Sequence, residues 1–340
     1  MPSPLNLITD VAGLRVGNRH DGRIASGVTA VLVAQPNVAS GVVRGGAPGT
    51  TGVSMLAPEM TVQGVDAVVL SGGSAYGLDA SGGVMAALRA KGIGFQVGHA
   101  VVPIVVQAIT FDLLNGGDKT WARRPPYWDL GFEAANAAGR EAFPLGTHGG
   151  GFGATTANLK GGLGSASATT SGGYAVGAIV VVNAVGTVSI GDSPHFWAGA
   201  LERNGEFGGH GWPASVPETA LWLRLKGGAP PSTTIALVAT DASLTKAEAK
   251  RLAIMADDGL ARAIRPAHAP MDGDTVFAVA TQRKRLRDGA ADLTEIGMVA
   301  ADCLARAIAR GVYAATALPF AGAQPAWRDH FADRAPGAAP

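Results

Sequence analysis

The fold is decided by the stretch Pro230-Pro231-Ser232-Thr233-Thr234-Ile235-Ala236-Leu237-Val238-Ala239-Thr240. From residue 233 onward it is apolar and rich in β-formers, which predicts a buried strand. The glycines and prolines just before it, in 227–232, predict an exposed linker. A hydroxyl residue, Thr233, therefore stands where a flexible linker enters a core strand.

An enzyme with an N-terminal nucleophile needs a hydroxyl residue at such a junction before it matures. The Thr233 hydroxyl can attack the carbonyl of Ser232 and form an ester by an N-to-O acyl shift, and hydrolysis then frees Thr233 as a new N-terminus. The freed α-amine has a reference pKa of about 7.7–8.0, so part of it is neutral near pH 7 and can accept the hydroxyl proton. On the residues alone, an ordinary turn-to-strand junction is the commoner explanation of this pattern.

The same periodicity arguments predict strands and helices on both sides of this stretch. Short apolar runs bounded by glycine predict strands at 29–34, 62–70, 176–182 and 274–281. Apolar stripes predict helices at 78–90, 133–140, 243–260 and 293–313, with Ser243 or Thr245 as a cap of the third. The remaining regions are a proline-containing loop before residue 133 and a glycine cluster at 145–173. Because strands and helices come in blocks, we expect an α+β fold layered around sheets.

The composition excludes several classes of protein. The chain has 340 residues with 49 glycines, 47% apolar residues, 16% charged residues and a net charge of +1. A disordered chain is less hydrophobic or more highly charged, and collagen repeats glycine at every third position. Without a basic excess, nucleic acid is not expected as a partner. The low charged fraction favours a homo-oligomer, because more surface than usual is then covered.

The chain also lacks the usual signs of a membrane or secreted protein. The longest central apolar run, 178–182, is far shorter than the roughly 20 residues of a membrane span. The first residues show no basic region followed by an apolar stretch, and Cys303 is the only cysteine, so no disulfide framework exists. We expect a cytoplasmic enzyme that does not bind membranes.

Common cofactor and metal motifs are absent from the sequence. There is no Walker A loop and no His-Glu-x-x-His. The loop at 72–77 carries Tyr76 where a nucleophile elbow needs glycine, and the glycines at 149–154 lack the strand and the acidic residue of a dinucleotide site. The seven histidines are scattered, and His268 alone lies near residues of chemical interest. We therefore expect neither a cofactor nor a metal.

A second candidate for chemistry is the segment Met271-Asp272-Gly273-Asp274-Thr275, which immediately precedes an apolar strand. Two acids that flank one glycine can both point toward one site. A solvated loop is the commoner explanation, and an EF-hand is excluded because no further ligand positions follow.

Several motifs together resemble one family over roughly residues 5–320. They are Leu7-Ile8-Thr9-Asp10-Val11-Ala12-Gly13-Leu14-Arg15-Val16-Gly17, Arg44-Gly45-Gly46-Ala47-Pro48-Gly49-Thr50, Leu70-Ser71-Gly72-Gly73-Ser74-Ala75-Tyr76-Gly77-Leu78-Asp79-Ala80, Lys160-Gly161-Gly162, Val182-Asn183, Thr233-Thr234-Ile235 and Asp272-Gly273-Asp274-Thr275. Each motif alone is weak, but their joint order is highly specific. The chain resembles the DmpA-type aminopeptidases, which include β-peptidyl aminopeptidases and nylon-oligomer hydrolases.

The resemblance implies a four-layer αββα fold, related to the ornithine acetyltransferases, and a chain that cuts itself in two. It implies one catalytic domain over 1–320, cleaved into 1–232 and 233–340, with a flexible tail at 321–340. It also implies a homo-oligomer, often a tetramer of cleaved pairs.

The resemblance further implies roles for individual residues. Thr233 matches the nucleophile exposed by cleavage after Ser232, and Asn183 matches the oxyanion-hole asparagine. Asp272 and Asp274 match an acidic pair that orients the amine of the nucleophile and positions its proton.

This chain departs from the family pattern at three positions. Relatives often have asparagine where Ser232 stands before the nucleophile. The nylon-oligomer hydrolases have a catalytic lysine that aligns with Asn158, two residues before Lys160. A tyrosine of some relatives aligns with Phe111, which has no hydroxyl. Lys160, Asn158, Phe111 and Ser74 are candidate neighbours of the substrate or the oxyanion.

The leading hypothesis is a cofactor-free amide hydrolase. It would act on N-terminal residues of small peptides, on amino-acid amides or on related oligoamides, including nylon-type oligomers. Two alternatives are an acyltransferase that uses the same Thr233 nucleophile and an unprocessed ligand-binding relative in which Thr233 is only a strand residue.

Overall fold

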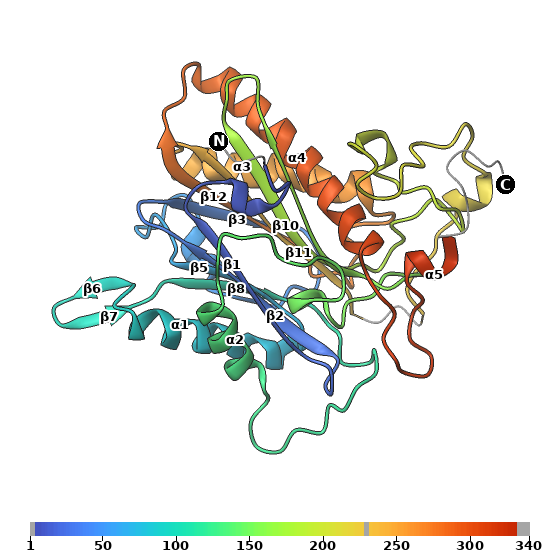
Figure 1. The fold of residues 1–340 in the computed structure, drawn as a ribbon. Coiled ribbons are helices and arrows are strands. Elements are labelled where there is room, and N and C mark those ends of the chain that lie inside the picture. Colours follow the sequence, from blue (N-terminus) through green and yellow to red (C-terminus); the bar gives the residue numbers. More distant parts are fainter. Residues whose placement is uncertain (1–3, 228–230, 332–340) are drawn as a thin grey trace.

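Two five-stranded β-sheets packed face to face form the centre of the protein, and helices cover the outer face of each (Figure 1). The computed structural model describes residues 4–227 and 231–331. Helix, sheet, sheet and helix follow one another through the molecule, so the expected α+β fold with four αββα layers is confirmed. None of the helices in these two described stretches is long and apolar enough to cross a membrane.

The first sheet has the strand order β1-β2-β5-β8-β4. Its strands are β1 (Leu14–Asp21), β2 (Ser26–Val33), β5 (Ala67–Ser71), β8 (Val105–Ile109) and β4 (Thr50–Thr51). Strands β5 and β8 are parallel and the other pairs are antiparallel. Helices α1 (Ala80–Ala90) and α2 (Tyr127–Asn136) lie over its outer face, where Val84, Leu88 and Tyr127 are buried.

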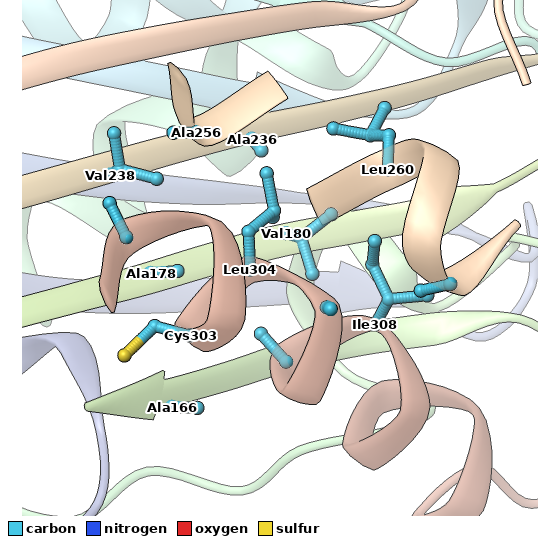
Figure 2. Packing of buried hydrophobic residues seen from close by; sticks show 14 of the residues in the cluster. Ala166, Ala178, Val180, Ala236, Val238, Ala256, Leu260, Cys303, Leu304 and Ile308 are labelled. Carbon is cyan, nitrogen blue, oxygen red and sulfur yellow. The ribbon is translucent and has the colours of Figure 1, made fainter. Parts of the chain in front are cut away.

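The second sheet has the order β3-β12-β11-β10-β9. Its strands are β3 (Val38–Val43), β12 (Thr275–Lys284), β11 (Thr233–Ala242), β10 (Ala175–Asn183) and β9 (Gly162–Thr169). Only β11 and β12 run parallel. Helices α3 (Lys246–Ala263) and α4 (Gly289–Tyr313) cover this sheet, and Figure 2 shows Leu260 of α3 and Leu304 of α4 over Val180.

The remaining elements are short. A hairpin of β6 (Phe95–Val97) and β7 (Ala100–Val102) projects from the first sheet (Figure 1). Short 3-10 turns lie at Ile8–Asp10, Val53–Leu56, Ser74–Asp79, Gly149–Gly151, Gly199–Leu201 and Glu218–Leu221.

The strands predicted at 29–34, 176–182 and 274–281 and from residue 233 are confirmed, whereas the run at 62–70 forms a strand only as β5, Ala67–Ser71. Strand β8 was not predicted, and neither was β9. Strand β9 lies inside the glycine cluster and is built from small residues rather than β-formers. Its glycines admit α4 to within backbone contact, since a Cβ on Gly164 would lie 1.8 Å from the carbonyl oxygen of Ala307. Packing against a helix, not strand propensity, therefore selects this sequence.

The helix predictions agree with the structure except at one place. Thr245 caps α3, where its hydroxyl accepts the backbone N–H of Glu248, as one of the two expected caps. The helix expected at 133–140 instead spans Tyr127–Asn136. Its N-cap is Pro126, so the proline pair that indicated a loop in fact precedes the first helical turn.

Two expectations concern segments that adjoin residues outside the described ranges. Half of the predicted linker, residues 228–230, lies outside the described residues, and Gly227 and Pro231 on either side are exposed. The structure differs from the flexible tail expected at 321–340. It contains α5 (Trp327–Phe331), whose Trp327 is buried and stacks on Phe196 at 5.7 Å, because aromatic burial ties this segment down. Residues 332–340 lie outside the description.

Candidate active site

The pairing of β10 with β11 brings two of the predicted site residues together. The strands are antiparallel, and Thr233, the first residue of β11, faces Asn183, the last residue of β10. Both side chains are buried, at 3% and 1% exposure. The end of β10 and the start of β11 thus place a carboxamide and a hydroxyl side by side, at the ends of two inner strands of the sheet.

The parallel pairing of β11 with β12 brings in the acidic pair. Because these strands run in the same direction, the residues before each of them also lie side by side, and Ser232 forms a parallel bridge with Asp272. The segment 272–274 therefore lines the peptide bond that precedes Thr233. The predicted nucleophile, cleavage position, carboxamide and acids all meet at this place, which we call the strand-end region (Ser232–Thr234, Asn183, Lys226 and 268–274).

The carbonyl of Ser232 is held by two donors. The backbone N–H of Gly273 donates to it at 2.9 Å, and the hydroxyl of Thr233 donates to it as well. Gly273 is needed here for space, since a Cβ would lie 2.9 Å from Thr233 Oγ1 and 2.8 Å from the oxygen of Ala47. The peptide bond between Ser232 and Thr233 is thus polarised and has its neighbouring hydroxyl at hand.

The carboxamide of Asn183 is fixed from three sides. Its Nδ2 donates to the carbonyl oxygen of Phe111 at 3.0 Å. Its Oδ1 accepts the backbone N–H of Thr155 at 3.0 Å and the ammonium of Lys226 at 3.2 Å. One Nδ2 hydrogen is used on Phe111, so the amide retains a second hydrogen for another acceptor.

Lys226 is a functional candidate that the sequence analysis missed. It is 9% exposed, and its Nζ also donates to the backbone oxygen of Asn183 at 3.4 Å. Burial lowers the pKa of Lys226 to about 7, against the opposing influence of Asp272 and Asp112. Its only signal in the sequence is its place a few residues before Ser232.

The two acids have different surroundings. Asp274 Oδ1 accepts the backbone N–H of Thr234 at 2.7 Å, and its Oδ2 accepts two bonds from His268. Asp272 Oδ2 accepts the N–H of Ala269 at 3.2 Å, and the backbone N–H of Val185 also lies near this carboxylate, although the buried Oδ1 makes no hydrogen bond of ordinary geometry with the described residues. Burial and the adjacent Asp274 raise the pKa of Asp272 to about 7. A carboxyl group whose pKa is raised toward neutrality in this way is typical of acid–base sites.

Lys160 lies next to this region but is bound to the backbone. It is 1% exposed and donates to the carbonyl oxygens of Gly151, Ala154 and Gly161 at 3.1, 2.8 and 2.9 Å. Burial lowers its pKa to about 7. Its three hydrogens are all used, so Lys160 holds together the loop that leads to Thr155.

The other predicted neighbours of the substrate or the oxyanion are Asn158, Phe111 and Ser74, and their hydrogen bonds place them differently. Asn158 Nδ2 donates to Ser189 Oγ at 3.0 Å, and its bonds do not reach the strand-end region. Phe111 contributes its backbone carbonyl to Asn183. Half-buried Ser74 donates its N–H to the oxygen of Thr110, one residue before Phe111.

A cavity of about 300 Å³ opens beside Asn183. Its walls include the residues that hold the carboxamide, Phe111, Thr155 and Lys226, and it reaches Pro231, next to Ser232. Within residues 4–227 and 231–331, no cluster of three or more His, Cys, Asp or Glu side chains is arranged to hold a metal ion.

Comparison with known sequences gives one family. The model of peptidase family S58 matches residues 6–324. An uncharacterised aminopeptidase of Mycobacterium tuberculosis is 44% identical over 348 residues, covering 96% of this chain and 98% of the relative. A 6-aminohexanoate-oligomer endohydrolase of Kocuria sp. is 28% identical, covering 80% of this chain and 74% of the relative.

Comparison with solved structures agrees at the level of the fold. A Burkholderia sp. beta-aminopeptidase has a TM-score of 0.71 with 22% identity, over 100% of this chain and 96% of the other. The L-aminopeptidase D-Ala-esterase/amidase of Ochrobactrum anthropi, described as a variant of the Ntn hydrolase fold, has a TM-score of 0.66 with 22% identity, over 94% of this chain and 89% of the other.

Proposed function

The chain belongs to peptidase family S58 and is a hydrolase of peptide or amide bonds, and we propose that it matures by cutting itself before Thr233. The observation that carries this proposal is that the carbonyl group of Ser232 accepts hydrogen bonds from two neighbours. Its oxygen accepts a bond from the Gly273 N–H at 2.9 Å, and the Thr233 hydroxyl lies against the same carbonyl group.

The self-cleavage would proceed as an N-to-O acyl shift. Thr233 Oγ1 bonds to the carbonyl carbon of Ser232, the C–N bond breaks, and the hydroxyl proton ends on the freed amine of Thr233. The Gly273 N–H stabilises the negative charge that develops on the carbonyl oxygen. Water then hydrolyses the ester and leaves chains 1–232 and 233–340.

The carboxylate of Asp272, which faces only the backbone N–H groups of Ala269 and Val185 among the described donors, would gain a charged partner once Thr233 becomes an N-terminus. Asp272 lies beside Ser232 in the parallel bridge, and its Oδ1 is buried without an ordinary hydrogen bond to the described residues. A new α-ammonium at Thr233 is a donor of the type that this oxygen lacks. Asp274 meanwhile anchors the next residue through the N–H of Thr234.

Substrate hydrolysis would use the same hydroxyl. The neutral amine of Thr233 takes the hydroxyl proton, and Oγ1 attacks the substrate carbonyl to form an acyl-enzyme. The second Nδ2 hydrogen of Asn183 stabilises the oxyanion, an interaction worth about 3 kcal/mol. Lys226 and Thr155 orient that amide, and water activated by the same amine releases the acid.

The substrates are proposed to be small peptides, amino-acid amides or short oligoamides that present an N-terminal residue. A cavity of about 300 Å³ lies at the lower end of the sizes usual for small-molecule sites. The name of the Kocuria relative refers to 6-aminohexanoate oligomers, which supports including synthetic oligoamides in the test.

The intact mass of the purified protein under denaturing conditions tests the proposal. We expect two species, 1–232 and 233–340, the smaller with Thr233 at its N-terminus, and hydrolysis of small amides. Thr233→Ala should remain one chain without amidase activity, whereas Thr233→Ser should keep both activities because it keeps the hydroxyl. If Thr233→Ala retains cleavage and hydrolysis, the mechanism is wrong; if transfer to an added amine replaces hydrolysis, the chain is an acyltransferase.

A further inference from the structure

His268 lies beside the acidic pair, where its ring and its backbone contact Asp274. Its Nδ1 is 2.9 Å from Asp274 Oδ2, and its backbone N–H donates to the same oxygen at 3.0 Å. The backbone of His268 is left-handed, with φ of 58°. Few non-glycine residues adopt that conformation, and here it accompanies two contacts of His268 with one oxygen of Asp274.

The other ring nitrogen of His268 faces a second carboxylate. Its Nε2 is 3.5 Å from Asp257 Oδ2 on α3, and Arg44 Nε lies 3.0 Å from that same oxygen. An imidazole with a carboxylate at each nitrogen can donate to both only when it carries two protons. The geometry therefore fits the imidazolium form of His268.

The charged groups around His268 form a nearly balanced set. The carboxylates are Asp274, Asp257 and, next to Asp274, Asp272; the cation beside them is Arg44. On the outer side, Arg262 and Arg265 line a cavity of about 380 Å³ together with His268. Arg262 pairs with Asp302 at 2.6 Å, and Arg265 donates to the oxygen of Leu221, so neither neutralises the acids.

We propose that His268 is a positioning residue whose imidazolium keeps Asp274 ionised, so that a proton taken up by the acidic pair at low pH binds to Asp272 beside Thr233. This inference rests on the function proposed above and extends it to the control of protonation. Three N–H groups, two from His268 and one from Thr234, converge on Asp274, whereas Asp272 faces the backbone N–H groups of Ala269 and Val185 and no cationic hydrogen-bond donor among the described residues. The contact with Asp274 raises the pKa of His268 above its ordinary value, with a further contribution from Asp257.

The first experiment follows the pH dependence of hydrolysis in His268→Gln. Loss of a cation beside two carboxylates raises the pKa of the pair, so the acidic limb of the kcat profile should move to higher pH by about one unit. At pH 6 this gives a kcat up to about tenfold lower, and the two profiles should converge at alkaline pH. The matched control Arg262→Gln removes a cation from the same cavity that does not touch the acids and should leave the limb in place.

A uniform loss of kcat in His268→Gln with an unmoved limb would mean that His268 is merely structural and would overturn the inference. The second experiment needs no activity. It uses the uncleaved Thr233→Ala chain with labelled histidine, in which the NMR resonance of His268 should titrate with a pKa above 6.5. This pKa should be lower in Asp274→Asn and, by a smaller amount, in Asp257→Asn.

These two experiments distinguish a failure of the proposed function from a failure of the inference about His268. If the wild-type chain neither cleaves itself nor hydrolyses amides, the proposed function fails, while the NMR titration still decides the link between His268 and Asp274. If His268 titrates at or below its ordinary pKa, the inference fails even in an active enzyme.

Discussion

Two neighbouring regions each bury a lysine and a carboxylate, but they differ in how completely those groups are paired. In the glycine-loop region (residues 149–161 with Asp112), Lys160 donates to three carbonyls, and both oxygens of Asp112 accept bonds, from Ser26 Oγ at 2.6 Å and from the Gly73 N–H at 2.8 Å. In the strand-end region, the hydrogen bonds of the Lys226 ammonium to described residues both go to Asn183, and Asp272 has an oxygen without a hydrogen bond of ordinary geometry to those residues, near the N–H of Val185.

The difference indicates where a new group can enter. Fully paired buried ions stabilise one arrangement of the backbone, and nothing can be added to them without loss. Incompletely paired buried ions are costly unless a partner arrives later. In the proposed mechanism the strand-end region would take two such partners, a freed amine and a substrate oxygen, whereas the glycine-loop region would support it.

The largest expected effect comes from closing the space around Ser232. A Cβ in Gly273→Ala would lie 2.9 Å from Thr233 Oγ1 and 2.8 Å from the oxygen of Ala47, so hydroxyl and carbonyl must separate. We expect self-cleavage to slow by about 100-fold or more, since a misplacement of 1 Å at a reacting centre costs about that much. Intact mass against incubation time measures the rate.

Gly289→Ala is the matched control for this substitution, because nothing lies within 4 Å of a Cβ at that helix start. It should cleave at the wild-type rate. Normal cleavage of Gly273→Ala would remove the steric basis of the proposed site.

The contacts around Ser232 follow only in part from the sequence. The strand from residue 233 and the strand at 176–182 follow from their β-branched apolar runs, and they fix the meeting of Thr233 with Asn183 once the strands are paired. That β11 and β12 are parallel neighbours depends on long-range topology, so only the family resemblance placed Asp272 by Ser232. The geometry agrees with that placement and leaves the residue's role to experiment.

Some residues had no signal of their own. Lys226 belongs to no motif, and its contact with Asn183 arises from how the chain returns from 184–225 to the cavity. Asn158 aligned with a relative's lysine, yet its bonds reach Ser189 and Thr156, because a shift of two residues in a tight loop changes the direction of a side chain. His268 was noted only for its neighbours, and its two carboxylate contacts require the fold.

The next effect distinguishes the two lysines. Lys226→Met should lower kcat by about 10- to 30-fold, since Asn183 loses a charged donor worth about 1.5–2 kcal/mol, with little loss of thermal stability. Lys160→Met should instead destabilise the fold by about 2–4 kcal/mol, because buried carbonyls lose their donors. Thermal melts and kcat normalised to the cleaved fraction give both readouts.

The opposite result would contradict the difference between the two regions: Lys226→Met would have a lowered melting temperature, while Lys160→Met would keep its stability and lose kcat. Lys91→Met, at an exposed lysine that directly follows α1, controls for the removal of a positive charge and should change neither quantity strongly.

The smallest effect concerns the unmatched acid in the uncleaved chain. Burial and Asp274 raise the pKa of Asp272 from an ordinary value near 4 to about 7, so between these values the folded chain binds more protons than the unfolded chain. Stability contributed by this group is then present below pH 4 and is lost as pH rises through 7. In the Thr233→Ala background, Asp272→Asn should remove about 1–2 kcal/mol of the decline between pH 5 and 7.

Urea unfolding at both pH values measures this decline directly. The control is Asp302→Asn in the same background, which removes a partly exposed carboxylate that is paired with Arg262 away from the strand-end region. An unchanged decline in Asp272→Asn would mean that Asp272 is already paired before cleavage. The contrast with Asp112 would then disappear, and with it the reason to expect the freed amine of Thr233 at this oxygen.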